Sequence, residues 1–192
     1  RKVLYDQYYG MEKEVVTGIV QRVMGKNVSV NLGKADGILS ENEQVKGEEF
    51  EPTERIKVYI LEVKDTPKGP RILLSRTHPG LVKRLFESEV AEVKDGTVEI
   101  KSIAREAGSR TKIAVWSNDP DVDPVGACVG MNGARVNSIV EELRGEKIDI
   151  INWDENPAIL IENALSPAKV IAVMADPDEK TALVVVPDYQ LS

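Results

Sequence analysis

The sequence is poor in residues on which many catalytic, metal-binding and extracellular proteins depend. Among its 192 residues there is one cysteine, Cys128, and one histidine, His78. A single cysteine excludes an intrachain disulfide and a cysteine zinc cluster, and Cys128 lies on an apolar helical stripe, where we expect a packed, inert thiol. A single histidine without a companion nucleophile disfavours a hydrolase triad and a histidine-rich metal site. We therefore expect no catalytic residue, no metal and no cofactor.

Long apolar runs and an excess of positive charge are also missing. No stretch approaches the roughly 20 apolar residues that span a bilayer, and the first residues, RKVLYDQYYG, lack the apolar core of a signal peptide. We expect a cytoplasmic protein without membrane contact. The net charge of -7 disfavours broad, nonspecific DNA binding, because counterion release needs a basic surface. Any nucleic-acid site must therefore be local.

The remaining composition is that of a globular protein. With 42% hydrophobic and 30% charged residues, the chain is long enough for two or three small domains. It begins at Arg1 rather than at a methionine and stops shortly after a strand-like segment. We therefore expect it to be an excised piece of a longer protein.

The stretch VGACVGMNGARVNSIVEEL has the pattern of two short helices joined by a Gly-x-x-Gly turn. We expect Asp123 to cap the first helix, with Pro124 at its first position. The turn, Gly130 to Gly133, has no side chain at either end, and the second helix begins with unpaired amide N–H groups at its positive dipole end. These features predict a site for a phosphate group. In the second helix, apolar residues at i, i+3, i+4 and i+7 share one face: Val136, Ile139, Val140 and Leu143.

A Gly-x-x-Gly turn is also common in plain helix–helix connections, so the flanking segments decide its interpretation. Strand-like segments precede the helices, at 97–104 and 111–117, and another follows at 146–153. This order resembles a type II KH domain, in which the turn holds the backbone of a short single strand and the bases lie in a neighbouring groove. Rival phosphate motifs do not fit, because a dinucleotide fingerprint needs glycine at Cys128 and a P-loop needs Gly-Lys at Met131-Asn132.

Residues 11–77 consist of short alternating segments separated by Gly, Pro, Asn and charged turns. Five such segments predict a small β-barrel. OB-folds usually stack bases on aromatic side chains of their central strands, but Val28-Ser29-Val30 offers none and Tyr59 is the only aromatic residue on a predicted barrel strand. The sequence leaves open whether the barrel contacts RNA or only spaces and orients its neighbours. The segment order resembles the OB-fold domain of ribosomal protein S1: 18–20, 27–33, 37–39, 56–63 and 72–75.

A basic hairpin is predicted by the segment VEIKSIAREAGSRTKIAVWS, with its turn at 107–109. Its basic residues form either a solvated charged surface or a secondary RNA contact beside the Gly-x-x-Gly turn. We treat them as a possible RNA-binding basic hairpin: Lys101, Arg105, Arg110 and Lys112.

Three aspartates at alternate positions, Asp119, Asp121 and Asp123, have the spacing of possible calcium or magnesium ligands. An EF-hand loop that begins at Asp119 would need glycine at Pro124 and glutamate at Gly130. We therefore expect turn and cap roles for the aspartates.

After Trp153 the chain begins a second cycle of the same elements. The segment NPAILIENALS predicts a helix, and KVIAVM and TALVVVP predict strands. Residues 181–185 repeat the character of 111–115, which indicates a tandem repeat of the unit. The Gly-x-x-Gly turn of the second unit would lie beyond Ser192.

Taken in order, the barrel ending ILLSRTHP, the linking helix, SNDPDVDPVGACVGMNGARV, GEKIDI and NALSPAKV resemble the NusA family of bacterial transcription factors over nearly the whole chain. The resemblance implies an α+β multidomain fold: a five-stranded OB-fold (S1-type) β-barrel, a type II KH domain and an incomplete second KH domain. The implied divisions are the end of an upstream linker helix (1–10), the S1-type domain (11–77), the first KH domain (78–153) and the N-terminal part of the second KH domain (154–192).

The resemblance also implies a function and a site. NusA-like proteins regulate elongation, pausing, termination and antitermination by binding nascent single-stranded RNA and RNA polymerase, with other antitermination factors as further partners. We expect a monomer that is not an enzyme. The family turn often carries a basic residue where this chain has Met131-Asn132, so binding here depends more on backbone N–H groups and Arg135. The implied RNA-binding residues are Gly130, Met131, Asn132, Gly133, Arg135, Lys147, Ile148, Asp149 and Ile150.

The alternative is the RNA-binding portion of an enzyme that joins S1 and KH units, such as a nuclease or polynucleotide phosphorylase. Such enzymes carry a large catalytic core, and the sequence offers no paired-carboxylate metal site in a suitable setting. A ribosomal KH protein is disfavoured because a barrel precedes the KH unit.

Overall fold

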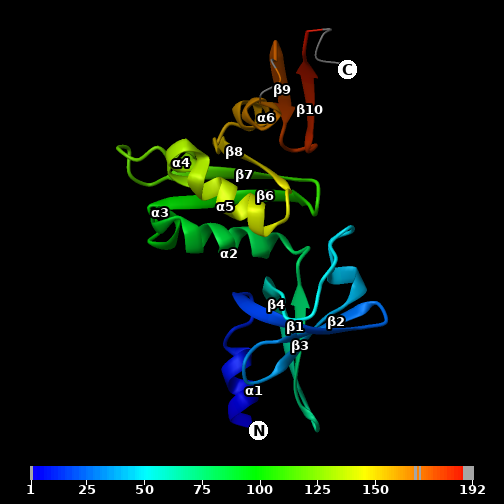
Figure 1. The fold of residues 1–192 in the computed structure, drawn as a ribbon. Helices are drawn as coiled ribbons and strands as arrows, with labels where there is room; N and C mark the ends of the chain where they lie inside the picture. Colours follow the sequence, from blue (N-terminus) through cyan, green and yellow to red (C-terminus); the bar gives the residue numbers. More distant parts are fainter. Residues whose placement is uncertain (1, 167, 169, 188–192) are drawn as a thin grey trace.

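The computed structural model describes residues 2–166, 168 and 170–187. Figure 1 shows a β-barrel near the N-terminus, a larger α/β unit beside it, and a small α/β unit near the C-terminus. Arg1, Pro167, Lys169 and residues 188–192, which the sequence analysis assigned to the flanking helix and the second KH unit, lie outside the described residues. None of the described helices is long and apolar enough to span a membrane.

The first unit is a closed barrel with strand order β1-β2-β3-β5-β4, as the five alternating segments predict. β3 and β5 pair in parallel, and the other neighbours are antiparallel. Successive strand residues face opposite sides, so Val58 and Ile60 on β4, with Ile72 and Leu74 on β5, fill the interior. The elements are α1 (Lys2–Tyr9), β1 (Val15–Met24), β2 (Asn27–Asn31), β3 (Asp36–Leu39), η1 (Glu41–Glu43), β4 (Arg55–Thr66) and β5 (Gly69–Ser75).

The second unit is a three-stranded sheet, β6-β7-β8, with helices on one face (Figure 1). β6 and β7 are antiparallel, and β7 and β8 are parallel. The order strand, strand, helix, turn, helix, strand confirms the KH-type fold. The elements are α2 (Pro79–Glu89), α3 (Ala91–Lys94), β6 (Val98–Glu106), β7 (Arg110–Ser117), α4 (Pro124–Val129), η2 (Met131–Gly133), α5 (Ala134–Glu142) and β8 (Lys147–Asn152).

Two helices of this unit, α2 and α4, begin at capping side chains. Asp123 Oδ1 accepts a hydrogen bond from the amide of Val125 (3.2 Å), which confirms its cap role. His78, expected only to lie in a turn, caps α2, because its Nδ1 accepts from the amide of Gly80 (2.9 Å). Apolar residues of α2 and α5 then cover the sheet and share one core with Cys128. Burial raises the pKa of the Cys128 thiol to about 11, in agreement with a packed, inert cysteine.

The third unit consists of α6 (Pro157–Leu165) and the antiparallel pair β9 (Ala172–Asp176) and β10 (Thr181–Val185). Asn156 caps α6 by accepting from the amide of Ala158 (3.0 Å). The helix packs against both β8 and β9 and so joins this unit to the preceding sheet.

The barrel and the KH unit meet around a buried arginine, Arg76, which directly follows β5. Its guanidinium is ion-paired with Glu48 of the barrel (2.8 Å) and Glu142 at the end of α5 (3.4 Å). It also donates to the carbonyl oxygens of Lys57 (2.7 Å) and Glu142 (3.1 Å). Arg144 adds an ion pair to barrel residue Glu54 (2.8 Å). The α5 helix therefore connects the Gly-x-x-Gly turn at one end with the barrel at the other.

Candidate nucleic-acid interface

The turn between α4 and α5 has a backbone that glycine favours at both ends. Gly130 adopts φ 78° and ψ 174°, and Gly133 adopts φ 77° and ψ 12°. Between them, Asn132 also has a positive φ of 53°. Asparagine tolerates this left-handed conformation better than most residues do. Met131 is 86% exposed and Asn132 is exposed, so the turn projects from the helices as an accessible loop.

Gly130 interrupts the helical hydrogen-bond ladder and leaves amide groups available. Its own N–H donates to the carbonyl of Gly126 (2.9 Å), but the next bond of an α-helix, from Met131 to Ala127, is not formed. The Ala127 carbonyl instead accepts from Arg135 Nη1 (2.8 Å). Within the described part of the chain, no group accepts a hydrogen bond from the amides of Met131 or Asn132. Two backbone donors without a protein acceptor among the described residues therefore lie just before α5, where a phosphate group could accept from them.

Arg135 lies behind the turn rather than extending from it. Its Nη1 is ion-paired with Glu92 of α3 (2.7 Å), and both side chains are about one-third exposed. The hydrogen bond from Arg135 holds the pKa of Glu92 below its usual range. A Cβ on Gly130 would come within 2.7 Å of Arg135 Cγ, so the absence of a side chain at Gly130 permits this packing. In this arrangement Arg135 contacts protein groups on two helices.

The strand β8 presents its predicted residues to two different faces. Ile148 and Ile150 pack against the helix-covered core and are partly exposed, as a groove for bases beside α4 requires. Lys147 and Asp149 point to the opposite face, because strand side chains alternate, and Asp149 is ion-paired there with Arg110 (3.4 Å). The side chains of Lys147 and Asp149 thus lie on the other face of the sheet from Ile148 and Ile150, and only the two isoleucines supply side chains to the predicted base groove.

Arg105 is not part of a basic surface, contrary to the hairpin prediction. Its side chain and that of Glu146 are each 1% exposed, and the two form an ion pair (3.0 Å). Glu146 also accepts from Thr111 Oγ1 (2.6 Å) and the Gly108 amide (2.7 Å). Burial alone would raise the pKa of Glu146, but these hydrogen bonds and the charge of Arg105 hold it below its usual value. Arg105 also donates to the His78 carbonyl (2.9 Å), so it fastens the hairpin to the start of α2.

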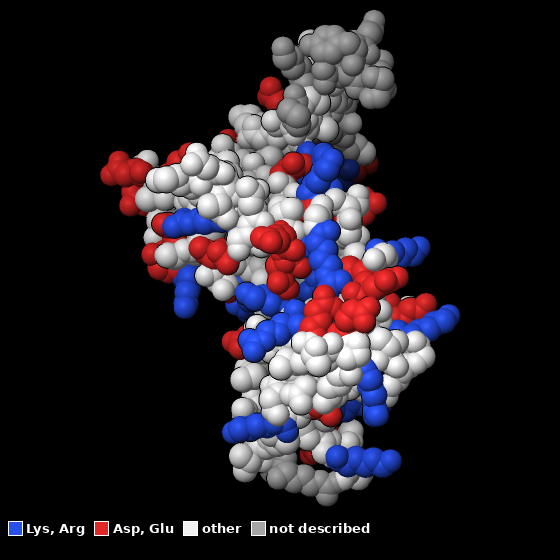
Figure 2. Space-filling view, viewed as in Figure 1, with Lys and Arg blue, Asp and Glu red and all other residues white. Residues whose placement is uncertain are grey.

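The other three basic residues of the hairpin have acidic or aromatic neighbours. Lys101 is paired with Glu99 (2.8 Å) and lies over the ring of Trp153 (5.2 Å). Lys112 donates to the Ala164 carbonyl of α6, on the face opposite the KH helices. Arg110 is about half exposed and shares Asp149 with Lys112. Figure 2 shows charges of both signs mixed over the visible face, so this surface is not a continuous basic field.

The one aromatic residue that the sequence places on a barrel strand, Tyr59, does not present its ring for stacking with RNA bases. Tyr59 is 6% exposed and packs against the His78 ring, with 4.4 Å between ring centroids.

The aspartates 119, 121 and 123 are exposed, and Asp119 Oδ1 accepts from the Asp121 amide (2.9 Å), which confirms their turn and cap roles. No group of three or more His, Cys, Asp or Glu in the described residues is arranged to hold a metal ion.

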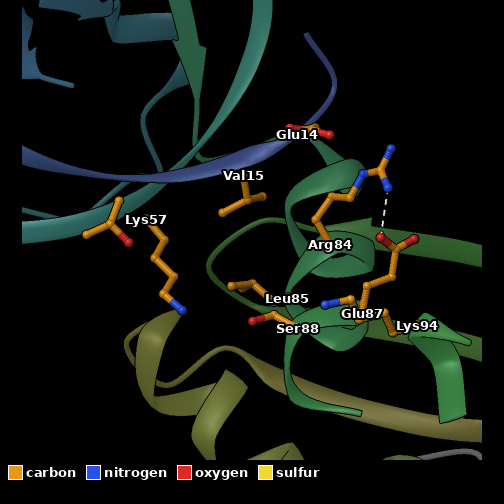
Figure 3. A pocket seen from close by; sticks show the side chains of 9 residues that line it. Glu14, Val15, Lys57, Arg84, Leu85, Glu87, Ser88 and Lys94 are labelled. Carbon is orange, nitrogen blue, oxygen red and sulfur yellow. Dashed lines mark hydrogen bonds and ion pairs between the residues drawn. The ribbon is translucent and has the colours of Figure 1, made fainter. Parts of the chain in front are cut away.

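A groove of about 360 Å³ lies where the barrel strands β1 and β4 meet α2 (Figure 3). Lys57, Arg84 and Glu87 are among the residues that line it, and Arg84 and Glu87 are ion-paired (2.7 Å). No residue of the Gly130–Gly133 turn lines the groove. The groove has mixed charges and is separate from the turn. The Gly130–Gly133 turn is therefore the better candidate site for a phosphate backbone.

Sequence reasoning missed two features near the site. Trp116 is 40% exposed and makes an edge-to-face contact with Trp153 (5.8 Å between centroids) at the ends of β7 and β8. The alternation along β7 could have placed Trp116 on the face that bears Lys112. The capture of the Ala127 carbonyl by Arg135 had no sequence signal, because it depends on the path of the turn.

Comparisons with known proteins agree with this geometry. Residues 10–75 match the S1 RNA binding domain, residues 76–153 the NusA-like first KH domain and residues 157–192 the NusA-like second KH domain. Over 192 residues the chain is 57% identical to the transcription termination/antitermination protein NusA of Bacillus subtilis, covering 100% of this chain and 52% of that protein. It is 46% identical over 193 residues to the protein of the same name from Thermus thermophilus, covering 100% of this chain and 50% of that protein. The chain thus spans about half the length of these curated relatives.

Proposed function

The chain belongs to the NusA family, and we propose that it binds nascent single-stranded RNA through the Gly130–Gly133 turn as part of a regulator of transcription. The observation that carries the proposal is the pair of amides, of Met131 and Asn132, that lie just before α5 and have no acceptor among the described residues. Backbone donors at a helix N-terminus bind phosphate without needing lysine. This agrees with a turn that has no basic residue in a chain of net charge -7.

The bases would lie between α4 and β8. Ile148 and Ile150 supply partly exposed apolar surface there, and apolar surface contacts unstacked bases without demanding one sequence. The surrounding surface carries both charge signs, so the contact is short and local rather than an extended electrostatic groove. The S1-type barrel orients the KH unit in this proposal, since its strand aromatic Tyr59 is buried.

We further propose that the whole protein acts in elongation, pausing, termination and antitermination through RNA polymerase and other antitermination factors. The names of the relatives and the RNA-binding domains support this role.

We propose a cytoplasmic monomer without catalytic activity, metal or cofactor. Labelled RNA incubated with the protein and magnesium should remain intact. Cleavage that copurifies with the protein and is lost in Asp119→Asn would contradict the absence of catalysis.

The test of RNA binding replaces Met131 and Asn132 with aspartate. Two negative charges beside the amides should repel phosphate and weaken RNA binding at least tenfold, while the exposed turn still folds. Fluorescence anisotropy with a short single-stranded RNA measures the affinity, and circular dichroism checks folding. The matched control is Met24→Asp with Asn27→Asp, the same change on the exposed barrel hairpin β1–β2.

The control should bind RNA with the wild-type affinity. Unchanged affinity in a folded Met131→Asp, Asn132→Asp protein would overturn the proposed site. If only the control loses affinity, the RNA lies on the barrel instead.

A further inference from the structure

We propose that Arg135 is a positioning residue of the turn: it occupies the Ala127 carbonyl, keeps the Met131 amide available for phosphate, and is itself held by Glu92. This inference rests on the proposed function, because it assigns a role within the same RNA site. It replaces the expectation that Arg135 contacts the phosphates directly.

The Ala127 carbonyl has two competing donors. In a continuing α-helix it would accept from the amide of Met131, four residues later. Gly130, at φ 78° and ψ 174°, diverts the Met131 amide from this acceptor, and Arg135 Nη1 occupies it instead at 2.8 Å. Without the guanidinium, the carbonyl would lose its partner, and a shift of the turn toward helix would recover a hydrogen bond. That shift would turn the Met131 amide inward and remove a phosphate donor.

Packing holds Arg135 in this position. Its Cγ, Cβ and backbone N lie 2.7–3.0 Å from the place that a Cβ on Gly130 would occupy. The aliphatic part of the side chain therefore packs against Gly130, while the guanidinium hydrogen-bonds to α4. Moving Nη1 to a ligand outside the turn would break its hydrogen bonds to the Ala127 carbonyl and to Glu92.

The two possible roles of Arg135 predict opposite effects of neutralising Glu92 on RNA affinity. It lies on α3 and accepts from Arg135 Nη1 at 2.7 Å. If Arg135 contacted phosphate, Glu92 would compete with RNA, and neutralising Glu92 should leave or raise the affinity. If Arg135 positions the turn, Glu92 anchors it, and neutralising Glu92 should lower the affinity despite removing a negative charge.

The first measurement is RNA affinity across a range of salt concentrations for Arg135→Met and Glu92→Gln. A cation that contacts one phosphate of a single strand contributes about 0.7 to the slope of log K against log salt. We expect Arg135→Met to lose roughly tenfold in affinity with an unchanged slope. We expect Glu92→Gln to lose affinity in the same direction. A slope reduced by about 0.7 in Arg135→Met, or unchanged or tighter binding by Glu92→Gln, would overturn the proposal.

The second measurement needs no RNA and separates this inference from the proposed function. Hydrogen exchange of the Met131 amide should be fast in the wild-type protein and slower in Arg135→Met, where the amide gains the Ala127 carbonyl. Equal exchange rates in the two folded proteins would overturn the positioning role even if the turn binds RNA. A third outcome is that exchange slows as expected in Arg135→Met while the Met131→Asp, Asn132→Asp protein binds RNA with unchanged affinity. That result would support the positioning of the turn by Arg135 and reject only the RNA site.

The controls are Arg144→Met and Glu54→Gln, which alter a matched ion pair at the barrel junction. That pair has a similar distance, 2.8 Å against 2.7 Å, and similar exposure, 30% and 36% against 34% and 33% for Arg135 and Glu92. Both controls should keep the wild-type RNA affinity, salt slope and Met131 exchange rate. An equal loss of affinity in the controls would show a general effect of charge removal and overturn the specific role of Arg135.

Discussion

At the scale of single residues, burial determines which charged groups can meet RNA. Arg105 and Glu146 are each 1% exposed and are satisfied by one another and by neighbouring groups. Removing one partner of such a buried pair leaves a charge without compensation. The two residues therefore contribute to the stability of the KH unit and not to its binding surface.

The Arg105–Glu146 pair predicts a specific loss of stability in acid. The pKa of Glu146 is lowered in the folded protein, so its contribution is fully present above the unfolded value of about 4.3 and is lost as pH falls through the lower folded value. Glu146→Gln should cost on the order of 3 kcal/mol at pH 7 and should show a smaller further loss between about pH 5 and 3. Urea unfolding at several pH values measures both. A variant that retains the full acid loss of the wild-type protein would contradict the assignment.

Single-residue roles were the least predictable part of the site. The sequence identifies Gly130–Gly133 and the apolar strand residues, because glycine spacing and hydropathy are local properties. It does not reveal that Arg105 is buried, because Glu146 lies 41 positions away and the two meet only in the folded sheet. Lys147 and Asp149 could have been separated from Ile148 and Ile150 by the two-residue period of a strand.

At the scale of elements, the α4–turn–α5 segment depends on two glycines with different constraints. Gly133 lies in the left-handed region, at φ 77° and ψ 12°, which asparagine can adopt. Gly130, at φ 78° and ψ 174°, lies in a region that is essentially restricted to glycine and is packed against Arg135. The glycine at the start of the turn therefore has no adequate substitute.

This difference predicts unequal effects of the same substitution. Gly130→Asn should destabilise the protein by about 1–3 kcal/mol and abolish measurable RNA binding, because the turn must change its path. Gly133→Asn should cost less than about 1 kcal/mol, and its added Cβ meets only the flexible Asn137 side chain, at 3.2 Å. Thermal unfolding and RNA titration of both variants make the comparison. Equal losses in the two proteins would show that the turn can relax at Gly130.

The elements themselves were largely predictable from the sequence. Asp123 and Pro124 marked the start of α4, and alternation marked all five barrel strands. The short helix α3, at 91–94, was missed because four residues are too few to show a helical period.

At the scale of the whole molecule, Arg76 joins the barrel to the KH unit. Its side chain is 1% exposed, and it bonds to Glu48 in the barrel and to Glu142 at the end of α5. The Glu142 carboxylate also accepts from the Lys57 amide of β4 (3.0 Å). No sequence pattern indicated this junction, because its members come from three separate segments.

The junction predicts that the barrel and the KH unit unfold together. Arg76→Met leaves Glu48 buried without its partner and should cost about 3–5 kcal/mol, and it should split one calorimetric transition into two. Differential scanning calorimetry tests this, with Arg71→Met on the exposed side of β5 as the control. Two transitions already present in the wild-type protein would show that the units are not coupled.

The most direct test of the central claim is a titration of the ¹⁵N-labelled protein with a short single-stranded RNA, followed by amide chemical shifts. We expect the largest shifts on the amides of Met131 and Asn132, with smaller shifts at Ile148 and Ile150. Lys112 and Trp116, on the opposite face of the sheet, and the barrel strands should remain unchanged. Shifts confined to the barrel or to the hairpin, with Met131 and Asn132 unmoved, would contradict the claim that this turn holds the RNA backbone.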